Sequence, residues 1–128
     1  MNILVEIAPG ELIDKITILE IKIENIRDQR RLENVKHEYR ILRDIYKSSV
    51  PESEALSVLA AKLKTINQKI WQLEDDIRDC ERVQDFGPKF IGIARSVYRT
   101  NDERASVKRQ INELLGSKII EEKSYSSY

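Results

Sequence analysis

The spacing of hydrophobic residues changes early in the chain. Ile3, Val5 and Ile7 alternate with polar or small residues, which is the two-residue period of a β-strand, and Pro9-Gly10 would end that strand. A strand needs a partner, and the only other candidate is the segment Lys118 to Glu121. We therefore expect an all-helical protein with, at most, a minor pairing of short strands from its two ends, within one chain or between two.

After Gly10 the apolar residues recur every three or four positions, which predicts an amphipathic first helix. This helix is apolar on more than one side, as is typical of a helix that is central in its bundle or shared with a second subunit. Its apolar residues are Leu12, Ile13, Ile16, Ile18, Leu19, Ile21, Ile23 and Ile26.

A second series of apolar residues follows, at Leu32, Val35, Tyr39, Leu42 and Tyr46. On an unbroken helix this series would lie about 120° from the first one. A break near Asp28, which could cap a second helix, would restore a common inward face. A continuous helix whose apolar stripe twists around the bundle is the alternative.

The strongest periodic signal follows the loop SSVPES at residues 48–53, where Ser53 is the expected N-cap. A helix from Ser53 to Asp85 would be about 50 Å long, so the molecule should be elongated, with the two N-terminal helices laid end to end antiparallel to it. An exposed part of its apolar seam would need a partner, and a homodimer is the simplest one. The seam has strict 3-4 heptad spacing, of coiled-coil type, at Leu56, Leu59, Leu63, Ile66, Ile70, Leu73, Ile77 and Cys80.

Gly87-Pro88 is expected to stop the long helix. We predict a short helix from Pro88 to Arg99 and a final helix from Asn101 to Leu115, ended by Gly116 as its C′ residue. The tail should be loose from about residue 124. The predicted fold is thus a single all-α domain over residues 1–128, an elongated antiparallel helical bundle.

Composition narrows the possible functions. The formal net charge is zero, with 22 basic and 22 acidic residues, so no overall field attracts nucleic acid. We expect no secretory signal and no membrane span, because no apolar run approaches the roughly 20 residues that a span needs. The single cysteine, Cys80, suits a cytoplasmic protein, and its seam position predicts a small buried residue rather than a nucleophile.

Local charge is uneven and suggests a first candidate site. Residues 71–87 hold six acidic and two basic residues, and residues 88–118 hold seven basic and three acidic ones. The simplest interpretation is that the two segments fold against each other and form surface ion pairs. The more specific interpretation is an anion pocket for phosphate, carboxylate or an acidic protein. It would lie at a helix start, which favours an anion, and would be formed by Arg95, Arg99, Arg104 and Lys108.

Thr100 and Glu103 weaken this pocket, because they match a capping box that would occupy the N–H groups of the helix start. An alternative site uses two carboxylate pairs, Glu11 with Asp14 and Asp76 with Asp79. These pairs resemble those that hold Mg²⁺ in all-helical nucleotide pyrophosphohydrolases, which implies a metal-dependent enzyme acting on phosphorylated substrates. Outside this alternative we expect no cofactor, since the chain has no glycine-rich phosphate loop and no cysteine–histidine zinc pattern.

Three segments resemble a family of small bacterial proteins of unknown function. They are GELIDKITILEIK at residues 10–22, IWQLEDDIRDCE at 70–81 and ARSVYRTNDERASVKRQINELLGSKIIEEKSY at 94–125. The resemblance implies no particular activity. The sequence therefore predicts a non-enzymatic helical interaction protein that self-associates and binds an anionic ligand or partner, with the metal-dependent enzyme as the alternative.

Overall fold

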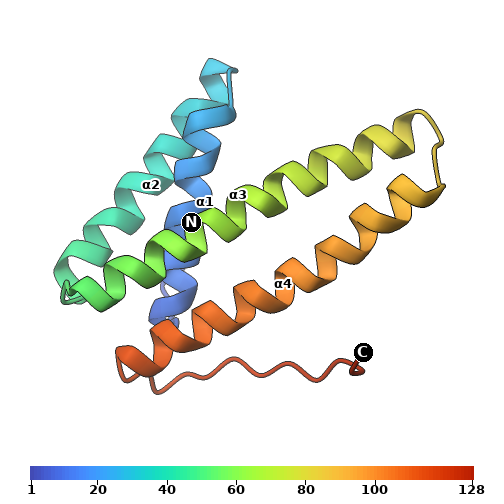
Figure 1. The fold of residues 1–128 in the computed structure, drawn as a ribbon. Coiled ribbons are helices and arrows are strands. Elements are labelled where there is room, and N and C mark those ends of the chain that lie inside the picture. Colours follow the sequence, from blue (N-terminus) through green and yellow to red (C-terminus); the bar gives the residue numbers. More distant parts are fainter.

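The structure, a computed structural model, describes residues 1–128 and consists of four helices (Figure 1). These are α1 (Pro9–Asn25), α2 (Gln29–Ser49), α3 (Glu54–Arg82) and α4 (Pro88–Leu114). The all-helical prediction is confirmed. No strand forms, and residues 1–7 are exposed, so the predicted pairing of the two ends is not present within the chain.

The helices are arranged as two hairpins that cross at a steep angle (Figure 1). The α1–α2 turn depends on Asp28, whose side chain accepts a hydrogen bond from the Arg31 N–H at 2.9 Å and caps α2. Because the chain turns back there, α2 packs along α1, and the prediction that both helices run end to end beside α3 is wrong. The reason is that α1 is apolar on several sides and packs against α2, α3 and α4 at once.

The ends of α3 and α4 follow local capping rules. Ser53 accepts a hydrogen bond from the Leu56 N–H at 3.1 Å and caps α3, as predicted. At the end of α4, Gly116 has a φ of 64° and its N–H bonds the Glu113 carbonyl, while the Ser117 N–H bonds the Asn112 carbonyl. This pair of bonds is a Schellman motif, so Gly116 is the C′ residue that the sequence predicts.

Two predicted boundaries are wrong. The long helix ends at Arg82 rather than Asp85, through a turn in which Gln84 adopts a φ of 57°, whereas the next helix, α4, begins at Pro88 as predicted. The expected break near Thr100 is absent, because α4 is continuous from Pro88 to Leu114. The Thr100–Glu103 capping pattern is overridden because Thr100 is buried inside this helix.

The hydrophobic core lies where the two hairpins cross, and all four helices contribute to it. Beyond the crossing, residues 70–103 of the α3–α4 hairpin project as a two-helix arm (Figure 1). We call this part the arm and the rest of the helical structure the body. Only two of the 20 buried residues, Cys80 and Thr100, lie in the arm. The core cluster consists of Leu12, Ile13, Ile16, Tyr46, Leu56, Leu63, Ile66, Val107 and Ile111.

After α4 the chain returns along this helix without regular secondary structure (Figure 1). This tail, residues 115–128, was expected to be loose at its end, yet it contacts the arm there. The Tyr128 hydroxyl donates a hydrogen bond to the Asp102 carboxylate, and its ring meets the Tyr98 ring edge-on at 5.3 Å. No helix of the chain combines the length and apolarity that a bilayer crossing requires.

Candidate functional site

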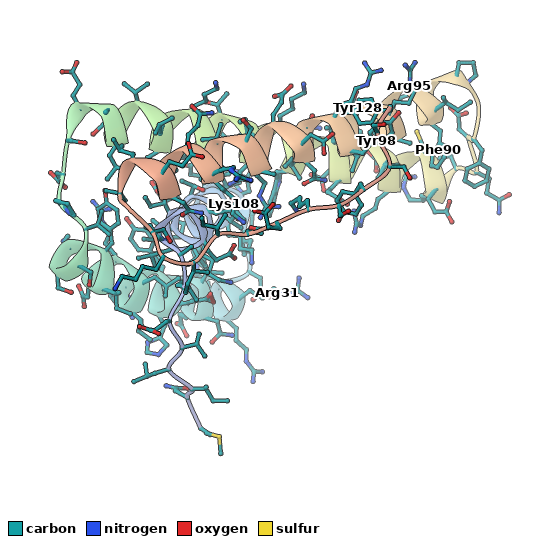
Figure 2. The ribbon with its side chains drawn as sticks, turned by 90° about the horizontal axis from the view of Figure 1, so that it is seen from below. Arg31, Phe90, Arg95, Tyr98, Lys108 and Tyr128 are labelled. Carbon is teal, nitrogen blue, oxygen red and sulfur yellow. The ribbon has the colours of Figure 1, made fainter.

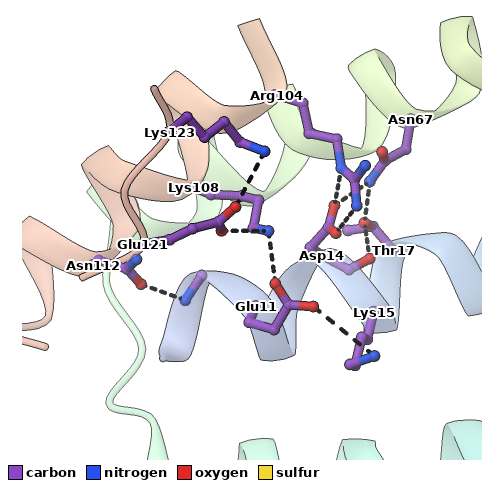
Figure 3. Close-up of polar contacts among 11 residues, drawn as sticks. Glu11, Asp14, Lys15, Thr17, Asn67, Arg104, Lys108, Asn112, Glu121 and Lys123 are labelled. Atoms are coloured by element: carbon purple, nitrogen blue, oxygen red, sulfur yellow. Dashed lines mark hydrogen bonds and ion pairs between the residues drawn. The ribbon is translucent and has the colours of Figure 1, made fainter. Parts of the chain in front are cut away.

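A cluster of polar residues joins α1, α3 and α4 at the centre of the body (Figure 3). Asp14 is only 1% exposed, and Arg104 donates to its two carboxylate oxygens, through Nε at 3.0 Å and through Nη2. Asn67 of α3 donates to Asp14 at 2.9 Å and to the Thr17 hydroxyl at 3.0 Å. A bidentate arginine–carboxylate pair with a third helix bonded to it fixes both the spacing and the register of these helices.

Lys108 extends the cluster from α4 to the tail. Its side chain is 10% exposed, and its ammonium group donates to Glu11 of α1 at 2.6 Å and to Glu121 of the tail at 3.1 Å. Lys123 also pairs with Glu121, at 3.2 Å. Lys108 therefore connects the start of α1 to the returning tail (Figure 3).

The contacts in this cluster favour the charged forms of Arg104, Lys108 and Glu121. Burial on its own lowers the pKa of Lys108, but the hydrogen bonds to Glu11 and Glu121 outweigh it, so the pKa is raised. The hydrogen bond from Lys108, followed by that from Lys123, lowers the pKa of Glu121. The bond to Asp14 raises the pKa of Arg104 against the effect of burial. These cations are therefore held as charged anchors of the fold.

The start of α1 is capped from another helix. The Gly10 N–H donates to the Asn112 side-chain oxygen at 2.7 Å, a cap that the residue at the N-cap position, Ala8, cannot provide. A Cβ atom on Gly10 would lie 2.6 Å from the Lys108 carbonyl oxygen, so the close approach requires glycine. No local pattern signals this contact, because Gly10 and Asn112 are 102 residues apart.

The four basic residues predicted to form an anion pocket do not converge. Arg104 and Lys108 point toward α1 and are ion-paired (Figure 3), whereas Arg95 and Arg99 of the arm are exposed; Figure 2 shows Arg95. The helix start that was expected to favour an anion is absent. Thr100, the predicted cap, lies inside α4 with a buried hydroxyl that has no hydrogen-bond partner.

Charge compensation occurs, but not between the acidic and basic segments that flank the α3–α4 turn. The basic residues Arg104 and Lys108 pair with α1 and the tail. The acidic segment of α3 forms pairs within its own helix, between Glu74 and Arg78 and between Asp79 and Arg82. The partners of the buried cations therefore come from parts of the chain that the charge pattern did not indicate.

The four carboxylates of the alternative metal site are not brought together. Glu11 and Asp14 are occupied by Lys108 and Arg104. Asp76 lies nine residues beyond Asn67, the α3 residue that contacts Asp14, which is about 14 Å along the helix, and Asp79 is farther still. No group of three or more histidine, cysteine or acidic side chains has an arrangement that could hold a metal ion.

A cavity of about 750 Å³ lies between α4 and the tail. Its lining is basic at the end near the body and aromatic at the end near the arm. Two of its basic residues, Arg104 and Lys108, are among the predicted site residues, but the residues of the tail were missed because the tail was expected to be loose. The cavity is lined chiefly by Tyr98, Arg104, Lys108, Lys123, Tyr125 and Tyr128.

Comparison with known proteins agrees with the resemblance noted in the sequence. Neither the curated proteins nor the solved structures gave a significant match to the chain. A family profile, however, matches nearly the whole sequence, including the exposed N-terminal segment from Ile3 and the tail. The chain therefore belongs to a family of unknown function, DUF6165, whose profile covers residues 3–128.

Proposed function

We propose that this chain is a non-enzymatic helical interaction protein that forms a homodimer through its arm. The observation that supports this proposal is the incomplete cover of the arm's apolar side chains. Ile91 and Phe86 are 54% and 53% exposed. The apolar residues between the two arm helices are only half-buried, at Ile70, Leu73, Ile77, Phe90, Ile93 and Val97.

The heptad seam of α3 is mostly buried in the body but mostly only half-buried in the arm. In the body, Leu63 is fully buried and Ile66 is 6% exposed, because the α1–α2 hairpin packs across them. In the arm the seam continues at the half-buried Leu73 and Ile77, with only α4 beside it. Knobs-into-holes packing buries such a seam when further helices are added, so a second copy can supply the missing layer.

Charge favours one arrangement of the two copies. The arm part of α3 is net acidic, with Glu74, Asp75, Asp76, Asp79 and Glu81 against Arg78 and Arg82. The arm part of α4 is net basic, with Lys89, Arg95 and Arg99 against Asp102 and Glu103. A two-fold axis along the arm places α3 of each copy over α4 of the other, so unlike charges meet. An axis across the arm would place acidic helix on acidic helix. We therefore propose a four-helix coiled-coil arm with both tips at the same end.

The mass in solution tests the proposal. The wild-type chain should sediment as a dimer, at twice the 15.0 kDa chain mass, at micromolar concentration. Leu73→Glu plus Ile77→Glu should give a monomer that keeps its helical circular dichroism. The matched control is Val58→Glu, on the same helix but in the body and 61% exposed, which should leave the dimer intact. A monomer mass for the wild type at high micromolar concentration would remove the proposal.

A charge-swap experiment tests the axis separately from the existence of the dimer. Lys89→Glu plus Arg95→Glu should weaken self-association, because acidic groups then face acidic α3. Mixing this variant with Asp75→Lys plus Asp76→Lys should restore a mixed dimer. If the two variants dimerise as well alone as together, the arms are not arranged with α3 over α4.

A cytoplasmic location is part of the same proposal. The one cysteine, Cys80, is a free thiol and is buried in the arm. Stability of this fold therefore needs no disulfide and no oxidising compartment.

A further inference from the structure

The cavity between α4 and the tail has two chemically different ends. Lys108 lines the end near the body, together with Lys123, which shares the partner Glu121 with it. Tyr98 and Tyr128 line the end near the arm (Figure 2), and Arg104 lies between Tyr98 and Lys108 on α4. Tyr98 and Lys108 are ten residues apart on α4, so the cavity extends over about 15 Å of the helix. The tail runs antiparallel to α4 and supplies the opposite wall (Figure 2).

The basic end holds hydrogen-bond donors that the protein does not use. Arg104 bonds Asp14 through Nε and Nη2, which leaves its Nη1 group able to donate. Lys108 uses two of its three N–H donors, on Glu11 and Glu121. Because Asp14 fixes the guanidinium group, Arg104 presents its remaining donors without further loss of side-chain freedom.

The charges around the cavity favour a ligand with one negative charge over a ligand with several. Three cations line it, Arg104, Lys108 and Lys123, against one lining carboxylate, Asp102. Behind these cations, however, stand the carboxylates of Asp14, Glu11 and Glu121. Together with Asp102 these are four carboxylates, which outnumber the three cations by one, so a ligand with a single negative charge meets less repulsion here than one with two.

The end of the cavity near the arm is suited to an aromatic ring. Tyr98 and Tyr128 meet edge to face at 5.3 Å, and the Arg99 guanidinium lies 5.9 Å from the centre of the Tyr128 ring. The Tyr128 hydroxyl is bonded to Asp102, whose negative charge disfavours an anion at this end. A ligand would therefore place its ring near the tyrosines and its anionic group near Arg104.

We propose that this cavity binds a small aromatic carboxylate, with the carboxylate at Arg104 and Lys123 and the ring against Tyr98 and Tyr128. The lining comes from α4 and the tail of one chain, so the site needs no residue of the proposed second copy. Since the tail forms one wall, a bound ligand joins the tail to α4. Ligand binding should therefore reduce the motion of residues 123–128.

Nuclear magnetic resonance titration of the full chain tests the site. The probes are 3-phenylpropionate, its neutral amide and phenyl phosphate. The carboxylate should shift the amide signals of residues 97–108 and 123–128 in a saturable way. The amide should bind at least about tenfold more weakly, because it lacks the charge-assisted hydrogen bonds. Equal affinity of acid and amide would overturn the proposal, and tighter binding of phenyl phosphate would overturn the single-charge argument.

Variants of exposed residues separate the site from the fold. Lys123→Ala should weaken carboxylate binding about tenfold, and Tyr128→Ala should weaken the acid and the amide alike. The matched control is Lys118→Ala, an exposed lysine that does not line the cavity and should bind as the wild type does. Equal affinity of the Lys123 and Lys118 variants, or no saturable shift with any probe, would show that the cavity is not a carboxylate site.

Discussion

The body and the arm use the same two helices, α3 and α4, but differ in what covers them. In the body the α1–α2 hairpin crosses both helices, and Leu63 and Ile111 have no exposed surface. In the arm the same seam of α3 continues, and only Cys80 and Thr100 are buried. The difference shows that periodicity predicts which face of a helix is apolar, whereas burial depends on how many helices pack there.

Their charged groups differ in the same way. In the body, ion pairs join distant segments at buried positions, as between Asp14 and Arg104. In the arm, pairs such as Asp79 with Arg82 join neighbouring turns and are exposed. Exposed pairs contribute about 0–1 kcal/mol, while removing one partner of a buried pair costs about 3–5 kcal/mol. The body should therefore be far more sensitive to loss of a single carboxylate.

The largest expected effect comes from Asp14→Ala. This change leaves Arg104 without its carboxylate and Asn67 with only the Thr17 hydroxyl as acceptor, and it should lower the free energy of unfolding by about 3 kcal/mol, since Arg104 keeps some solvent contact. Asp79→Ala in the arm is the control and should cost less than about 1 kcal/mol. Urea denaturation followed by circular dichroism measures both, and equal losses would contradict the distinction between body and arm.

A second comparison uses two glycines. Gly10→Ala should destabilise the protein by about 1–3 kcal/mol, because the added Cβ meets the Lys108 carbonyl oxygen. Gly92 lies inside α4 in the arm, where an added Cβ would meet no atom within 4 Å, so Gly92→Ala should stabilise the protein by about 0.5–1 kcal/mol. Thermal unfolding should shift in opposite directions for the two variants. A shift in the same direction would mean that α1 does not approach α4 closely.

The smallest expected effect concerns the tail and pH. The folded pKa of Glu121 lies below its ordinary value of 4.5, so its contribution is present above pH 4.5 and is lost as pH falls through the lowered value. Acidification below pH 4.5 should therefore detach the tail, at a cost of less than about 1 kcal/mol because Glu121 is partly exposed. Nuclear magnetic resonance relaxation that shows faster backbone motion of residues 118–128 below pH 4.5 would report this.

Two variants check the assignment to Glu121. Glu121→Gln should show this faster tail motion already at neutral pH and little further change on acidification. The control is Glu122→Gln, which should retain the wild-type pH dependence. Glu122 is exposed, and its carboxylate lies 3.6 Å from the Arg109 guanidinium, which is long for an ion pair. A wild-type profile in the Glu121 variant would exclude this carboxylate as the group that holds the tail.

Much of the local structure could be predicted from the sequence. The apolar periodicity predicted the helical fold, and Asp28, Ser53 and Gly116 marked helix ends that the structure confirms. These signals act over three to five residues, so they are present in the chain regardless of its tertiary fold. The breadth of the apolar surface on α1 also predicted that this helix would be central.

The candidate site was predicted less well, because its contacts join residues far apart in the sequence. Arg104 and Lys108 were selected as basic residues, but their partners Asp14 and Glu11 lie 90 and 97 positions away and were assigned to a different hypothesis. The tail's contribution to the cavity was missed altogether. The charge pattern of a sequence shows which residues are charged, but it does not show which oppositely charged residue each of them will pair with in the fold.

The sequence by itself determined the helices, their caps and their apolar faces, because each depends on neighbours within a turn or two. Only the tertiary structure decided that α2 folds back on α1, that Thr100 lies inside α4, and that Asn112 caps the start of α1. It also divided one continuous heptad seam into a covered half and an open half. The physical reason is that these outcomes depend on long-range packing, in which burial of the apolar surface of α1 outweighs the local signals of other segments.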